Sequence, residues 1–150
     1  LLICQFAGEK QIRHADHTVH RRAQLVAHRG EECGFGAVRV LRRFLRDGKI
    51  VRRFGETAAI MKEAGFNGVQ IHGAHGYLVS QFLSPRHNRR EDAYGGSAEN
   101  RRRFPVEIVE ETRRRCGPDF IIMYRLSVID LVPDGCTREE VLDLARCGSA

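Results

Sequence analysis

The chain of 150 residues contains no tryptophan, only four prolines and only three lysines. No apolar run approaches the length of about 20 residues that a membrane-spanning helix requires. The first residues also lack the basic flank and the small-residue cleavage site of a secretory signal. We therefore expect no membrane partner and a cytoplasmic location.

Paired cysteines are missing as well, because the five cysteines are an odd number and none of them forms a C-x-x-C spacing. This usage disfavours a disulfide framework and predicts reduced thiols. His14, His17 and His20 recur at every third position, but no carboxylate or thiolate stands in matching register. We therefore expect solvated histidines here and no metal site.

Because lysine is scarce, the net charge of +6 comes almost wholly from arginine. Two arginine triplets, Arg101–Arg103 and Arg113–Arg115, fall on one helical segment with Glu107, Glu110 and Glu111 between them. This mixture predicts a solvated helix face with ion pairs rather than a stripe that follows phosphates. The chain has no interleaved aromatic residues and no recognisable binding motif, so we expect no nucleic-acid partner.

A helix followed by a strand is predicted from Val51 onward. Phe54, Ala58 and Met61 recur at helical spacing, and the pattern ends at Gly65. A tight turn then leads into a short apolar strand at 69–72. This order of elements is typical of a βα fold with a parallel sheet.

A second helix is predicted to begin after Ser97, which is a good N-cap residue. Pro105 is expected to interrupt it, because proline lacks the backbone N–H that a continuous helix needs. We therefore predict a first turn at 98–103 and a regular helix at 105–115.

The near-continuous apolar run at 120–124 predicts a strand that is buried on both faces of a parallel sheet. Thr137 and Glu140 form a capping box at the start of a last helix. Residues 1–7 are consistent with a front strand, whereas residues 8–48 show no sustained periodicity. A closed (β/α)8 barrel needs eight strand–helix units. The fold class we predict is therefore α/β, a partial TIM (β/α)8 barrel of roughly the central half.

Reactive side chains gather beyond the ends of the two central strands. His72 and His75 could both donate hydrogen bonds to one carbonyl oxygen, and Tyr77 could deliver a proton. Arg125, at the end of the next strand, could stabilise a developing anion. Each residue alone is often structural, since a loop histidine is usually solvated and a tyrosine usually packs. The combination at neighbouring strand ends is what favours a catalytic site.

Two long motifs carry a family resemblance. Residues 64–85, which include GVQIHGAHGYL, and residues 88–104, NRREDAYGGSAENRRRF, closely resemble the Old Yellow Enzyme family of FMN-dependent ene-reductases. The resemblance covers about 51–147, and 1–7 faintly. It implies a TIM barrel with FMN at its carboxyl face.

The resemblance also implies roles for individual residues. His72 and His75 match the pair that binds the activating carbonyl of the substrate, and Tyr77 matches the residue that protonates its α-carbon. Arg125 matches the basic residue near the N1/O2 edge of the flavin, and Gln5 matches a contact to the flavin pyrimidine. NAD(P)H would reduce the flavin, and flavin N5 would pass hydride to an activated C=C bond of a small-molecule substrate.

The branch of the family stays open. Residues 104–107 and 120–132 resemble the 2,4-dienoyl-CoA reductase branch, which would add 4Fe–4S and FAD sites outside this chain. That branch usually lacks the His-x-x-His pair present here. The substrate could therefore be a dienoyl or enoyl thioester, or a free enone.

Departures from the family leave a second interpretation of the function open. Residues 8–48 resemble nothing in the family, the chain does not begin with Met, and it stops directly after a helical pattern. We divide it into a poorly matching segment at 1–50 and a partial FMN-binding barrel domain at 51–150. The alternative function is an inactive truncated or frameshifted fragment, and we expect the chain alone to hold FMN weakly.

Overall fold

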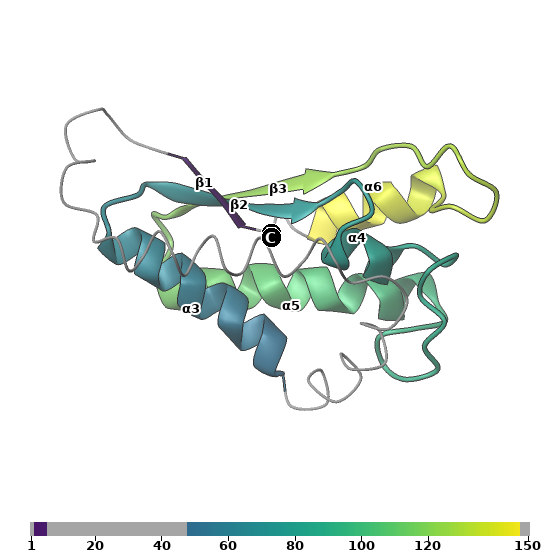
Figure 1. Ribbon diagram of the computed structural model, residues 1–150, viewed down its shortest axis with the longest axis horizontal. Helices are drawn as coiled ribbons and strands as arrows, with labels where there is room; N and C mark the ends of the chain where they lie inside the picture. Colours follow the sequence, from purple (N-terminus) through teal and green to yellow (C-terminus); the bar gives the residue numbers. More distant parts are fainter. Residues whose placement is uncertain (1, 6–47, 148–150) are drawn as a thin grey trace.

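A computed structural model describes the backbone of residues 2–5 and 48–147 and the side chains of residues 48–147. Three strands form one sheet in the order β1-β2-β3, and helices α3 and α5 pack together against one face of it (Figure 1). This mixture of helices and strands confirms the α/β class. The elements in chain order are β1 (Leu2–Gln5), α3 (Lys49–Glu63), β2 (Gly68–Gly73), α4 (Leu78–Leu83), α5 (Ala98–Cys116), β3 (Ile121–Leu126) and α6 (Arg138–Cys147).

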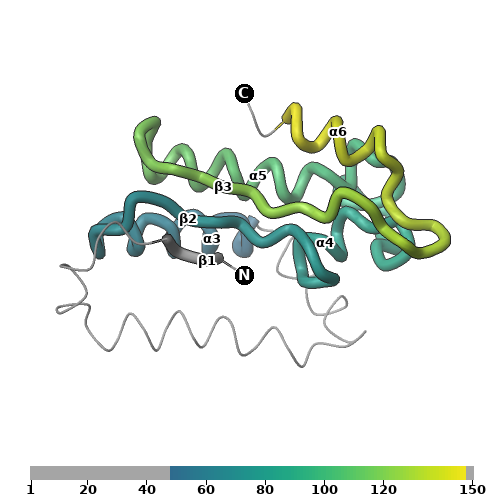
Figure 2. Tube along the Cα trace, turned by 90° about the horizontal axis from the view of Figure 1, so that it is seen from above, coloured from purple at the N-terminus to yellow at the C-terminus, as the bar shows by residue number. Residues whose placement is uncertain are grey.

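The sheet is parallel in only one of its two pairings. Strands β2 and β3 are parallel, as the sequence predicts, and their register puts Ile71 opposite Tyr124 and His72 opposite Arg125. Strand β1 confirms the front strand, but it runs antiparallel to β2, with Gln5 opposite Gly68. The strands of a (β/α)8 barrel are all parallel, so β1 does not add a barrel unit here. Figure 2 shows β2 between its two neighbours.

The core lies between the sheet and the helices. Alternate residues of β2 point to the helices, so Val69 and Ile71 are fully buried while His72 lies on the other face. One core cluster joins β2 to α4 and α5, and a second joins β2 to α3 and the end of α5. The buried members are Ile71, Val79, Phe82, Phe104 and Ile108 in the first and Ala58, Met61, Val69, Cys116 and Phe120 in the second.

The helix ends follow the local sequence signals. The Ser97 hydroxyl accepts a hydrogen bond from the backbone N–H of Asn100, which confirms the N-cap of α5. Thr137 and Glu140 form the reciprocal capping box before α6, at 3.1 and 3.2 Å. Helix α5 ends at Cys116, where Gly117 takes a positive φ of 79°.

One helical prediction was wrong, and one short helix was not predicted. Helix α5 runs without interruption through Pro105, which is fully buried, and core packing offsets the one hydrogen bond that proline cannot donate. Helix α4 was not predicted; its six residues follow Tyr77 and bury Val79 and Phe82. Only these two side chains are buried, and this is too short a periodic pattern to distinguish a helix from a loop.

Two burial predictions were also wrong. Strand β3 is not buried on both faces, since Ile121 is 56% exposed and Arg125 is exposed. Arg101 does not lie on a solvated helix face, because it is only 7% exposed and contacts backbone carbonyls and Glu140. In the last turn of α5, Arg114 and Arg115 do pair with Glu111 as expected.

The predictions for the region before α3 have no structural test. The irregular pattern at residues 8–47 and the spacing of His14, His17 and His20 lie outside the described residues. Within the described part of the chain, no helix has the length and apolar character needed to span a membrane.

Candidate functional site

The end of β2 brings together the three residues that the sequence singled out. His72 is the penultimate residue of β2 and is only 4% exposed. The chain then turns through a loop in which His75 has a positive φ of 58°, before Tyr77 becomes the N-cap of α4. The rings of His72 and His75 meet edge to face at 5.1 Å, and the rings of His72 and Tyr77 lie 5.0 Å apart. The predicted cluster therefore forms, with His72 at its centre.

Arg125 extends the cluster onto the neighbouring strand. It stands opposite His72 in the β2–β3 register and is exposed. Because side chains alternate along a strand, both residues lie on the sheet face opposite the core helices. The cluster thus combines a buried imidazole with a cation at one sheet edge.

Two residues of the same face were missed at the sequence level. Gln70 and Met123 are paired in register, two residues before His72 and Arg125 respectively. The period of two along a strand was the available signal, because it assigns every second residue to one face. Gln70 and Met123 therefore form a second row behind the histidine cluster.

The proton of His72 can be assigned from its hydrogen bond. The backbone N–H of Ala74 donates to Nδ1 at 3.4 Å, which leaves the ring proton of a neutral imidazole on Nε2. Burial lowers the pKa of His72, and the nearby His75 and Arg125 lower it further. A neutral His72 therefore presents one N–H donor.

The lowered pKa of His72 makes stability depend on pH. The unfolded chain binds a proton at the ordinary histidine pKa of 6.5, whereas the folded chain resists it. The stability associated with neutral His72 is therefore complete above pH 6.5 and is lost as the pH falls below it. Urea unfolding at pH 7.5 and 5.0 measures this loss. We expect the stability advantage of the wild type over His72→Asn to shrink at pH 5.0, and an advantage independent of pH contradicts the assignment.

Gln5 is the fifth predicted site residue, and the structure describes only its backbone. Gln5 occupies the last position of β1, opposite Gly68, but its side chain lies outside the described residues. Its contact to a flavin stays a prediction.

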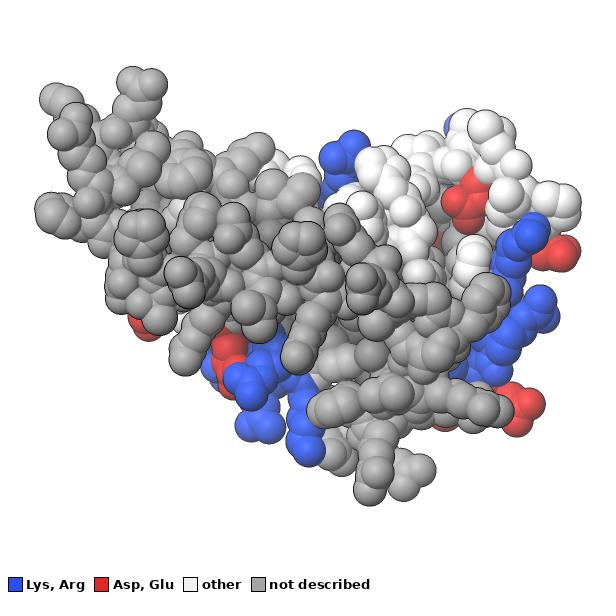
Figure 3. Space-filling view, in the orientation of Figure 1, with Lys and Arg blue, Asp and Glu red and all other residues white. Residues whose placement is uncertain are grey.

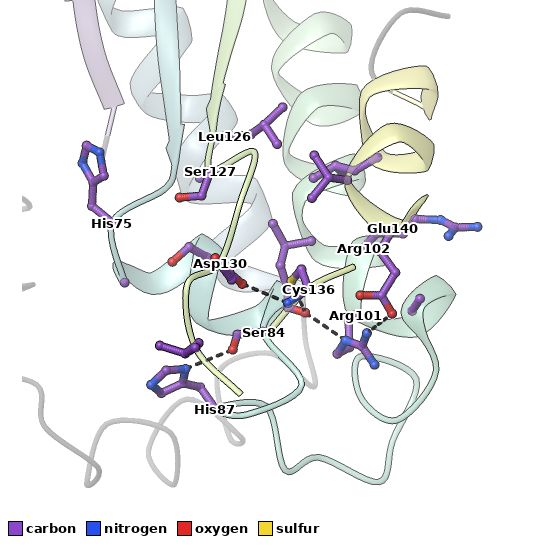
Figure 4. A pocket seen from close by; sticks show the side chains of 18 residues that line it. His75, Ser84, His87, Arg101, Arg102, Leu126, Ser127, Asp130, Cys136 and Glu140 are labelled. Atoms are coloured by element: carbon purple, nitrogen blue, oxygen red, sulfur yellow. Dashed lines mark hydrogen bonds and ion pairs between the residues drawn. The ribbon is translucent and has the colours of Figure 1, made fainter. Parts of the chain in front are cut away.

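A cavity of about 200 Å³ adjoins the cluster and extends toward α6. His75 lines one end, and Figure 4 shows Ser84 and His87 at a distance from it. The Ser84 hydroxyl and His87 Nδ1 are 3.1 Å apart, and the Cys136 thiol donates to the carbonyl of Leu83 at 3.4 Å. These polar groups of the cavity wall are thus partly paired with one another.

Charges elsewhere on the described surface are mixed. In Figure 3 the basic side chains form separate groups, and acidic side chains lie beside the groups at the lower left and on the right. Arg53 pairs with Glu56 at 2.9 Å and Arg146 with Asp143 at 3.0 Å. Among residues 48–147, no three histidine, cysteine or acidic side chains are grouped as metal ligands would be.

Comparison with known proteins reveals close relatives. The NADH oxidase of Thermoanaerobacter brockii is 46% identical over 98 residues, which are 65% of this chain and 15% of that protein. The cinnamate reductase of Clostridium sporogenes is 51% identical over 87 residues, 57% of this chain and 13% of that protein. Among solved structures, a 2-naphthoyl-CoA reductase complex superposes with a TM-score of 0.65 at 37% identity, over 68% of this chain and 16% of that one.

The chain is much shorter than these relatives, since it spans only 13% and 15% of the two sequences. A family model nevertheless matches residues 22–147, and so includes residues 22–50 as well as the two long motifs. The match covers most of the chain and contains every element from α3 to α6. The chain belongs to the NADH:flavin oxidoreductase / NADH oxidase family.

Proposed function

We propose that the chain supplies the substrate-carbonyl site of an FMN-dependent NAD(P)H oxidoreductase that reduces an activated C=C bond. The observation that supports this most directly is the cluster at the end of β2, where His72 lies 5.1 Å from His75 and 5.0 Å from Tyr77. Two imidazoles and a phenol within one loop can contact one small molecule at several of its atoms. The adjacent Arg125 adds a permanent positive charge.

The residues present fit a flavin. The sheet face that carries Gln70, His72, Met123 and Arg125 is turned away from the core helices, and Arg125 on it is exposed. An exposed guanidinium can hold the flavin edge that becomes anionic on reduction, and Gln5 is proposed as a second contact. FMN, when bound and reduced by NAD(P)H, supplies the hydride.

The chain itself acts on the substrate carbonyl and on a proton. His72, neutral with its proton on Nε2, donates a hydrogen bond to the carbonyl oxygen, and His75 donates a second. These two bonds withdraw electron density from the conjugated C=C bond. The Tyr77 hydroxyl then donates a proton to the α-carbon of the substrate.

The substrate class is proposed from the substrates for which two relatives are named. One relative is named a cinnamate reductase and one solved structure is a 2-naphthoyl-CoA reductase complex. Both names describe a conjugated acid or its thioester. We therefore favour an α,β-unsaturated or dienoyl thioester or acid, with simple enones as the alternative.

The domain boundaries belong to the same proposal. We assign 51–150 to a partial TIM barrel of roughly its central half and 1–50 to an N-terminal segment, of which the family model includes residues 22–50. Any 4Fe–4S and FAD sites would lie outside this chain. The alternative function is an inactive truncated or frameshifted fragment of such an enzyme. A flavin titration of the purified chain tests this alternative, since tight binding would contradict it.

Replacing Tyr77 with phenylalanine tests the proposed reaction. In flavin-loaded protein we expect the rate of alkene reduction to fall by about 10²- to 10⁴-fold, because the proton donor is lost. Flavin reduction by NAD(P)H should be unchanged, since Tyr77 has no part in that step. Stopped-flow absorbance of the flavin measures both half-reactions separately.

Tyr94→Phe is the matched control for this experiment. The Tyr94 hydroxyl donates to Glu107 at 2.8 Å, away from the histidine cluster. We expect both half-reactions of this variant to keep their rates. An unchanged rate of alkene reduction in Tyr77→Phe would overturn the assignment of Tyr77 as the proton donor.

A further inference from the structure

The tyrosine of β3 fills the place of a missing side chain on β2. Tyr124 stands opposite Ile71 in the parallel register and packs against the same core cluster. A Cβ built on Gly73 would lie 2.1 Å from the Tyr124 hydroxyl oxygen and 2.4 Å from Cζ. Both distances are far below van der Waals contact. The tip of Tyr124 therefore occupies the space where any larger residue at position 73 would put its side chain.

Space, rather than backbone conformation, requires glycine at this position. Gly73 is absent from the described glycines with positive φ, a group that includes its neighbour Gly76 at 75°. A glycine in a strand without such a dihedral marks the close approach of another group. At Gly73 that group is the phenol ring of Tyr124.

The contact between Gly73 and Tyr124 lies where the loop that carries His75 and Tyr77 begins. Gly73 directly follows His72 and precedes the turn that carries His75 and Tyr77. Hydrogen bonds also hold this turn. The Ala74 N–H donates to His72 Nδ1 at 3.4 Å, the Tyr77 N–H donates to the Ala74 carbonyl at 3.4 Å, and the Gln81 backbone and side chain donate to the carbonyls of Tyr77 and Gly76 at 2.9 and 2.7 Å. The packing of Tyr124 against Gly73 acts together with these bonds on the position of the loop relative to the sheet.

Hydrogen bonding does not account for the tyrosine. Its hydroxyl is buried and has no partner among the described residues. A buried hydroxyl without a partner opposes folding, so Tyr124 contributes to this contact through the shape of its ring. A phenylalanine would preserve most of that shape.

We propose that Tyr124 and Gly73 are paired positioning residues that set the placement of the His72–His75–Tyr77 loop at the end of β2. Their importance for catalysis rests on the proposed function, but their effect on the loop does not. The effect can be followed at His72, which is only 4% exposed and whose ring contacts those of the loop residues His75 and Tyr77. A displaced loop exposes this imidazole.

A double-mutant cycle without flavin tests the pairing. We expect Gly73→Ala and Tyr124→Leu each to lower the urea midpoint and to raise the pKa of His72 toward that of an exposed imidazole. The double variant should recover part of both changes, because the new methyl group takes the space that the ring tip has left. Tyr124→Phe should leave the His72 pKa as in the wild type. Titration of the imidazole C–H signals by NMR measures the pKa.

The control is Val79→Ala, which removes a fully buried side chain of the same core cluster from α4. It should lower the urea midpoint and leave the His72 pKa unchanged. If Gly73→Ala does not fold, the His72 pKa values of Tyr124→Leu and Tyr124→Phe are compared instead. The proposal is overturned if the His72 pKa is unchanged in Tyr124→Leu. It is also overturned if the stability losses of Gly73→Ala and Tyr124→Leu add up to that of the double variant. Either result is independent of whether the protein reduces alkenes.

Discussion

We expect the Arg101→Ala variant to lose about 3–5 kcal/mol of its free energy of unfolding, because it breaks a buried ion pair. The Arg101 side chain is only 8% exposed, and its guanidinium group joins three segments. Nε donates to the carbonyl of Leu83 at 2.8 Å, and the two terminal nitrogens donate to the carbonyl of Gly96 and to Glu140, each at 2.5 Å. Removing it takes this donor from all three acceptors, and the weaker thiol donor of Cys136 at the Leu83 carbonyl does not replace it.

The loss of the Arg101 contacts should loosen the packing of α5 against α4 and α6. Leu83 ends α4, Gly96 lies just before α5, and Glu140 belongs to the capping box of α6. Arg101→Lys should not restore stability, because a single ammonium group cannot donate in three fixed directions. Urea unfolding followed by circular dichroism measures all the variants.

Arg102→Ala provides a matched control one residue away on the same helix. Its guanidinium approaches Asp143 only to 3.9 Å, and the two side chains are 26% and 46% exposed. A pair of this kind contributes about 0–1 kcal/mol. If Arg101→Ala and Arg102→Ala lose similar amounts, the buried cation does not hold the three segments together.

A loss of similar size, about 3–5 kcal/mol, is expected for Phe104→Ala. Phe104 is fully buried in the core cluster that joins β2 to α4 and α5. Its ring centroid lies 4.2 Å from that of Phe82 and 6.4 Å from that of Tyr94. Alanine would leave a cavity between α5, α4 and the loop that joins them.

Leu131→Ala is the control for this substitution, since Leu131 is 92% exposed. A surface truncation of this kind changes stability by about 0.5 kcal/mol or less. Chemical denaturation of both variants under one set of conditions compares them directly. A loss below about 1 kcal/mol for Phe104→Ala would mean that the cluster repacks around the missing ring.

Local signals of the sequence were accurate where the interaction is itself local. The N-cap at Ser97 and the capping box of Thr137 and Glu140 span three residues each and formed as predicted. The cluster of His72, His75 and Tyr77 also formed, because six consecutive residues at a strand end cannot separate widely. Parallel pairing then placed Arg125 opposite His72.

Burial could not be inferred where it depends on distant segments. Arg101 looks like the other arginines of α5, yet the carbonyl of Leu83 and the carboxylate of Glu140 surround it. Ile121 belongs to an apolar run, yet it is 56% exposed because the described segments leave that part of β3 uncovered. Pro105 stays within a helix because its surroundings bury it completely.

By itself, the sequence determined the α/β class, the βα order of elements, the family resemblance and the residues of the candidate site. Periodicity, caps and motifs are properties of neighbouring residues, so they can be read without coordinates. Only the tertiary structure decided the antiparallel direction of β1, the burial of Arg101 and the contact of Tyr124 with Gly73. Each of these depends on which segments meet in space, because a side chain is buried or paired only by groups that the fold brings to it.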